Sequence, residues 1–202
     1  MQVFAFLRFA VAVAASLAPV VGRTQQPESI YSDLVGSKCR WDAIGKEPGE
    51  ADQQTKRCPG VGGATIVINP WHSYNFIGFT WPKRKPVTEV VRGSALGLKL
   101  EWRGRRTARG FDPYAAIIRV MFRGEGGAEF ERQVLGVMRV RPGDACAVAF
   151  IDMAANAKPY ELARQAADSL VQPFVCGRDR PRAYGVPSRW TTLLLEQKPI
   201  AY

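Results

Sequence analysis

The stretch DACAVAFIDMAANAKPYELARQAADSLVQPFVC, residues 144–176, decides the fold of this chain. Its first part, Ala145–Asp152, is apolar on both faces, which is typical of a strand in the middle of a sheet. Its second part, Pro159–Gln172, has apolar residues four apart, which indicates an amphipathic helix that starts at a proline and ends before Pro173. The stretch therefore predicts a central strand with a helix packed on it and a cysteine near each end.

The segments before this stretch have the pattern of strands. The Pro-Gly turn in Arg141–Asp144 predicts a hairpin between Phe130–Arg141 and Ala145–Asp152. Leu96–Arg103 and Tyr114–Arg123 alternate with a period of two, which favours an antiparallel sheet with one packed face. We expect the inward side chains to be Leu96, Leu98, Leu100 and Trp102 on the first strand, and Tyr114, Ala116, Ile118, Val120 and Phe122 on the second.

Shorter segments at 39–44, 64–69 and 74–81 complete the predicted sheet. Together they predict an α+β fold: a curled antiparallel meander of about six or seven strands, with one amphipathic helix packed on it and two disulfides. We expect this single domain to span residues 38–176. On the helix, Arg164 and Asp168 are four residues apart, and we expect them to pair on its solvent side.

The two ends of the chain differ from this domain. Residues 1–22 combine one cation, Arg8, with a short apolar run and small residues, which predicts a secretory signal peptide cleaved near Gly22. An uncleaved anchor is the alternative, although the run is shorter than the roughly 20 residues of a membrane span. The signal predicts export to the periplasm or the extracellular space. Residues 23–37 predict a loose lead-in, and residues 177–202 a basic, partly extended tail in which Trp190–Glu196 adds an edge strand or stays loose.

Four cysteines follow the predicted signal, and an even number of cysteines in an exported chain predicts disulfides. Of the three possible pairings we favour Cys39–Cys58 and Cys146–Cys176, because each joins neighbouring elements. Zinc is the alternative, but the cysteines lack CxxC spacing and the chain has one histidine. We therefore expect no metal site.

A resemblance rests on two of these regions. The segment Cys58-Pro59-Gly60-Val61-Gly62-Gly63, with Glu161-Leu162-Ala163 in the helix and the closing Cys176, resembles a group of small exported bacterial proteins of unknown function. The resemblance implies a four-cysteine exported domain and brings no activity with it.

Catalytic motifs are weak in this sequence. His72 stands alone in a turn, no G-x-S-x-G motif is present, and Gly60–Gly63 precedes a strand rather than a phosphate-binding helix. We therefore expect no cofactor. Asp152, at the end of the central strand, and Glu161, in the first helical turn, are candidates for an acid–base pair in one cleft. The alternative is that Asp152 caps backbone N–H groups and Glu161 stabilises the helix N-terminus.

Two basic segments that contain tryptophan are the best functional hint in the sequence, whose net charge is +10. Lysine and arginine beside tryptophan hold anionic polymers through charge and stacking. If the two segments follow successive strands of a meander, they lie at opposite ends of the sheet. The alternative is that they are solvated loops that keep the protein soluble. The candidate ligand-binding residues are Trp81, Lys83, Arg84 and Lys85 in the first segment, and Trp102, Arg103, Arg105, Arg106 and Arg109 in the second.

The sequence favours two classes of function. The first is an exported, non-catalytic envelope module that binds an anionic envelope polymer, a membrane surface or an envelope protein; nucleic acid is an unfavourable partner for an exported chain. The second is a carboxylate-based hydrolase that acts on a cell-wall polymer. An inhibitor of host lysozyme fits the size and the compartment, but its target is basic and so is this chain.

Overall fold

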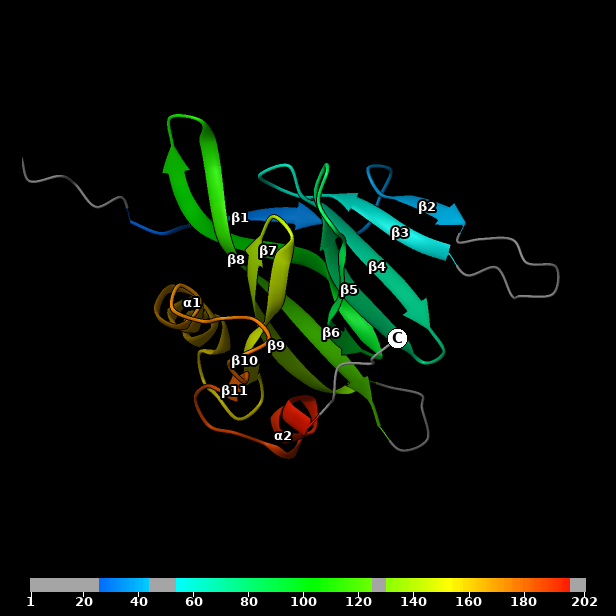
Figure 1. The fold of residues 1–202 in the computed structure, drawn as a ribbon. Helices are drawn as coiled ribbons and strands as arrows, with labels where there is room; N and C mark the ends of the chain where they lie inside the picture. Colours follow the sequence, from blue (N-terminus) through cyan, green and yellow to red (C-terminus); the bar gives the residue numbers. More distant parts are fainter. Residues whose placement is uncertain (1–25, 44–53, 125–129, 197–202) are drawn as a thin grey trace, which may run out of the picture.

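The computed structural model describes residues 26–43, 54–124 and 130–196, and within them the chain forms two sheets and two helices (Figure 1). The six-stranded sheet has the order β1-β7-β8-β9-β10-β11 and the five-stranded sheet the order β2-β3-β4-β5-β6. The first sheet contains β1 (Glu28–Asp33), β7 (Ala95–Thr107), β8 (Gly110–Arg123), β9 (Phe130–Arg141), β10 (Asp144–Asp152) and β11 (Arg182–Ala183). The second contains β2 (Arg40–Ala43), β3 (Gln54–Pro59), β4 (Thr65–Trp71), β5 (Tyr74–Thr80) and β6 (Val87–Gly93). The helices are α1 (Pro159–Leu170) and α2 (Arg189–Glu196).

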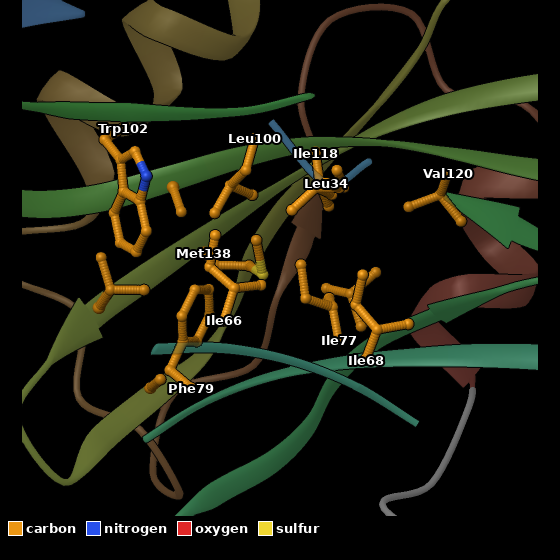
Figure 2. Packing of buried hydrophobic residues seen from close by; sticks show 14 of the residues in the cluster. Leu34, Ile66, Ile68, Ile77, Phe79, Leu100, Trp102, Ile118, Val120 and Met138 are labelled. Atoms are coloured by element: carbon orange, nitrogen blue, oxygen red, sulfur yellow. The ribbon is translucent and has the colours of Figure 1, made fainter. Parts of the chain in front are cut away.

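The two sheets pack face to face, and α1 covers the outer face of the six-stranded sheet (Figure 1). Side chains from both sheets fill the space between them, and Figure 2 shows Ile66 and Phe79 of one sheet beside Leu100 and Ile118 of the other. A second core lies between α1 and the other face of the six-stranded sheet, where the helix contributes Ala163, Ala166 and Ala167. Strands β8, β9 and β10 therefore pack on both faces, as the doubly apolar sequence of β10 predicts.

The α+β class, the hairpin of β9 with β10 and the helix that starts at Pro159 are confirmed. The strands form two sheets rather than one curled meander, because β1 pairs with β7 and leaves β2–β6 as a separate contiguous sheet. Residues 28–33, expected in a loose lead-in, are therefore a strand. Trp190–Glu196 was expected to be an edge strand or loose, but it lies in α2, and the edge strand of the tail is β11, parallel to β10.

Two bulges change which side chains point inward. The register of β7 against β8 shifts between Leu96 and Leu100, and Leu98, expected inside, is 59% exposed. A second shift leaves Tyr114 without a partner on β7, and its ring packs on the α1 side instead of between the sheets. A bulge inserts an extra residue into one strand and so redirects side chains near it.

Both predicted disulfides are present, Cys39–Cys58 and Cys146–Cys176. The second joins the start of β10 to the segment that follows α1, which holds the helix on the sheet. Loops of these lengths correspond to roughly 3–4 kcal/mol of stabilisation each in the chain-entropy account. Both bonds are compatible with an exported, oxidising compartment. The predicted signal, residues 1–22, lies outside the described residues.

Ion pairs also hold α1 on the sheet, and they replace the helix-surface pair expected between Arg164 and Asp168. Arg164 Nε lies 2.6 Å from Oε1 of Glu101 on β7. Arg103, also on β7, donates from Nε and Nη2 to the two oxygens of Asp168, at 2.8 and 2.7 Å. Both helix side chains thus face the sheet, where β7 offers partners of opposite charge.

Candidate functional site

The first basic segment, Trp81–Pro86, connects β5 to β6. Trp81 is only 9% exposed, and its ring contacts Phe79 at a centroid distance of 6.0 Å. Lys83, Arg84 and Lys85 are exposed. The segment therefore offers charge to solvent and keeps its aromatic ring in the core.

The second basic segment lies in β7 and in the hairpin that joins β7 to β8. Trp102 is fully buried, and its Nε1 donates a hydrogen bond to Ser32 Oγ at 3.0 Å. Arg103 is held by Asp168, which raises the pKa of its guanidinium above the ordinary value. Two of the predicted ligand-binding residues in this segment thus have structural partners, while Arg105, Arg106 and Arg109 are exposed.

The two segments lie at the same end of the sandwich, not at opposite ends. Strand β6, whose pattern in the sequence is weak, follows β5 in the chain and runs antiparallel to it, so the loop after β5 and the hairpin after β7 extend in one direction (Figure 1). The β9–β10 turn lies at this end too, because Gly143 is beside Arg84. We call the exposed cations at this end the basic end: Lys83, Arg84, Lys85, Arg105, Arg106 and Arg109.

Asp152 lies near the other end, in the wall of a cavity of about 810 Å³. Its side chain is 3% exposed, and Oδ1 accepts hydrogen bonds from the backbone N–H groups of Ala154 and Ala155, both at 2.8 Å. Oδ2 accepts from the hydroxyl of Ser188 at 2.5 Å. Ser188 in turn caps α2, because its Oγ accepts from the backbone N–H of Trp190 at 3.2 Å. The carboxylate thus fastens the turn after β10 to the start of α2.

Glu161 does not join Asp152 in this cavity. It lies in the first turn of α1, and its carboxylate is 3.2 Å from Lys158 Nζ on the exposed surface. The proposed acid–base pair is therefore not assembled. Asp152 accepts backbone N–H groups, as the alternative expected, and Glu161 lies in the first helical turn, where it pairs with Lys158.

We expect Asp152→Ala to lower the free energy of unfolding by about 2–3 kcal/mol, because two buried N–H groups and the Ser188 hydroxyl lose their acceptor. Asp152→Asn keeps an oxygen for the two N–H groups and should cost about 1 kcal/mol. Denaturant unfolding with the disulfides intact measures both, and Glu161→Ala, a change at an exposed ion pair, is the control. Equal losses for the Ala and Asn variants would contradict this bonding role.

Two further sequence features, His72 and the Gly60–Gly63 segment, show no catalytic arrangement in the described structure. His72 occupies the β4–β5 turn with φ 51°, edge-on to Trp71. Gly60 approaches Ala64 so closely that a Cβ would lie 2.6 Å from the Ala64 oxygen, so this loop requires glycine to turn into β4. Within the described ranges, no group of three or more His, Cys, Asp or Glu side chains is placed to hold a metal ion.

Arg123, Arg132 and Arg189 also line the cavity at the Asp152 end. These three arginines are not among the residues predicted from the sequence, because they come from β8, β9 and α2 and form no cluster there. The described part of the chain contains no helix with the length and apolar character of a membrane span. No family model matches this chain, and neither the curated proteins nor the solved structures contain a match.

Proposed function

We propose that this protein is an exported, non-catalytic envelope module that binds an anionic envelope component through its basic end. The observation that carries the proposal is that the β5–β6 loop of one sheet and the end of β7 with its hairpin in the other bring six exposed cations to one end of the sandwich. Among the described residues, only Arg106 of this set has a carboxylate partner, Glu28 at 3.2 Å. Cations without internal partners are available for an external anion.

The burial of Trp81 and Trp102 excludes binding by stacking of these rings on a ligand. The attraction therefore comes from charge. Charge-driven binding of a polyanion releases counterions and weakens steeply as salt rises. A phosphorylated or carboxylated envelope polymer presents many such charges along one chain and is the partner that this surface fits best.

A carboxylate-based hydrolase acting on a cell-wall polymer is the second candidate. One observation favours it, the position of Asp152 in the wall of a cavity of about 810 Å³. The hydrogen bonds that occupy both oxygens of Asp152 favour the binding module instead. Turnover of a cell-wall polymer that is lost in a folded Asp152→Asn variant would support the hydrolase.

The binding proposal is tested with two double variants at the basic end, Lys83→Gln with Lys85→Gln, and Arg105→Gln with Arg109→Gln. Each should weaken binding of a polyphosphate chain at least about fivefold and make its salt dependence shallower, because fewer counterions are released. Fluorescence anisotropy across a salt series measures both effects.

The matched control is Lys99→Gln with Lys158→Gln, which removes the same charge from exposed ion pairs away from this end. We expect the control to bind like the original chain. Binding that is equally strong at low and high salt, or equally weakened in all three variants, would refute the role of the basic end.

A further inference from the structure

The first residues of α2 line the cavity near Asp152. Helix α2 lies at the opposite end of the sandwich from the β7–β8 hairpin, which belongs to the basic end (Figure 1). The cavity volume of about 810 Å³ falls within the 300–1,000 Å³ range, approximately, of small-molecule sites. Three separate parts of the chain build it: the β8–β9 end of the sheet, the turn after β10, and the first residues of α2. A cavity of this size is larger than a single ion requires.

Arginines from three elements line the cavity. Arg123 ends β8, with its guanidinium 4.8 Å from the Phe130 ring centroid, Arg132 lies on β9, and Arg189 is the first residue of α2. Neither Arg132 nor Arg189 forms an ion pair or a side-chain hydrogen bond with any residue that the structure describes. Both residues are exposed, and no described side chain competes with a ligand for them.

The packing beneath the cavity explains why Arg132 and Arg189, from different elements, line the same cavity. Arg132 pairs with Phe122 across β8 and β9, so the two side chains share a face of the sheet. Phe122 stacks on Trp190 at a centroid distance of 5.5 Å, and Trp190 directly follows Arg189. The stacked rings thus fix the start of α2 beside Arg132 and supply an apolar part of the wall.

The charge of the lining favours an anion. Among the described lining residues three are arginines and two are carboxylates, and the oxygens of one carboxylate, Asp152, already accept hydrogen bonds from two backbone N–H groups and a hydroxyl. Glu131 is the other, and it disfavours an anion on its own side of the cavity. Arg123 has an interaction of its own, so the anion site rests on the other two arginines. Because Ser188 caps the α2 backbone, the ligand contacts come from guanidinium groups rather than from a helix N-terminus.

We propose that this cavity binds a small organic molecule that carries a phosphate or carboxylate group, of about the size of a sugar phosphate. The planar guanidinium fork pairs with both kinds of oxyanion through two parallel hydrogen bonds. Trp190 offers an apolar surface to the remainder of the ligand. The site is separate from the basic end and does not depend on the proposed polymer binding.

Calorimetric titration of the full chain with glucose 6-phosphate, glucuronate, inorganic phosphate and glucose tests the proposal. At least one of the two sugar oxyanions should bind, and which one binds more tightly distinguishes a phosphate site from a carboxylate site. Arg132→Gln with Arg189→Gln should weaken that binding at least tenfold, and the two corresponding lysine replacements should weaken it less. Lys99→Gln with Lys158→Gln should leave it unchanged.

Two results would overturn the proposal: neither sugar oxyanion binds more tightly than glucose, or binding survives in the folded Arg132→Gln, Arg189→Gln variant. If the glutamine variant does not fold, the lysine variant decides, since full affinity there removes the need for the guanidinium forks. If the chain binds polyphosphate but neither sugar oxyanion, this inference is refuted and the proposed function is not. If it binds a sugar oxyanion but not polyphosphate, the proposed function is refuted and this inference is not.

Discussion

Replacing Trp102 with alanine is expected to lower the free energy of unfolding by about 3–5 kcal/mol. The indole is fully buried between the sheets, where it contacts the Phe79 ring at 5.6 Å between centroids. Its removal leaves a cavity that the surrounding strands only partly fill, and it also deprives the Ser32 hydroxyl of its hydrogen-bond donor. Thermal unfolding should show a loss of roughly 10 °C, given the size of the chain.

Trp41→Ala is the matched control, because Trp41 is 53% exposed on β2 and should cost less than about 1 kcal/mol. A Trp102→Ala variant that keeps its stability but loses ligand binding would contradict the core role. It would restore Trp102 as a stacking platform beside the basic loops.

Glu101→Gln is expected to cost about 3 kcal/mol, the second large effect. Glu101 is 4% exposed, and its carboxylate accepts hydrogen bonds from Arg164 at 2.6 and 3.2 Å and from Ser29 at 2.6 Å. The hydrogen bonds with the Glu101 carboxylate raise the pKa of Arg164 above its ordinary value. The amide keeps the size of the side chain but removes the charge that holds α1 on β7, so Arg164 loses its ionic partner. Denaturant unfolding measures the loss.

Lys99→Gln controls for this change on the same strand. Its partner is Asp33 at 3.3 Å, and both side chains are more than half exposed, so its loss should cost less than about 1 kcal/mol. If the double variant Glu101→Gln, Arg164→Leu were no more stable than the sum of the single effects predicts, the two residues would act independently, contrary to the contact.

Much of the local structure follows from short-range pattern. Pro142-Gly143 specifies the β9–β10 turn, the alanines spaced along α1 specify its buried face, and the cysteines bracket neighbouring elements. Each of these signals lies within a few residues of the structure it determines, so a single sequence is enough to read it.

The assignment of strands to two sheets depends on contacts that are distant in sequence. Strand β6 has a weak pattern because a bulge opposite Gly78 interrupts it and Glu89 has a φ of 61°. Without β6, the two basic segments follow successive strands and fall at opposite ends. With β6 present, the chain reverses direction once more and the two basic segments lie at the same end. The position of the candidate binding surface therefore depends on this one strand.

The candidate site residues illustrate the same limit. In the sequence, Trp81 and Arg103 look like ligand-binding residues because they lie beside other cations. Their actual partners, Phe79 in the core and Asp168 on α1, are set by tertiary packing. Arg132 and Arg189 give no sequence signal, because only the folding of α2 beneath the sheet brings them to one cavity.

The pairing of β1 with β7 has a consequence for how the chain is made. Strand β1 is synthesised before the whole five-stranded sheet, and its partner follows only afterwards; Ser29 and Glu101, which bond across this pair, are 72 positions apart. Strands β2–β6 can pair through successive local hairpins. The pairing of β1 with β7 requires a contact between residues far apart in sequence, and such contacts form slowly. Until β7 is available, β1 offers an unpaired backbone edge to other chains. We therefore expect newly made protein to be most prone to aggregation before residues 99–104 have left the ribosome.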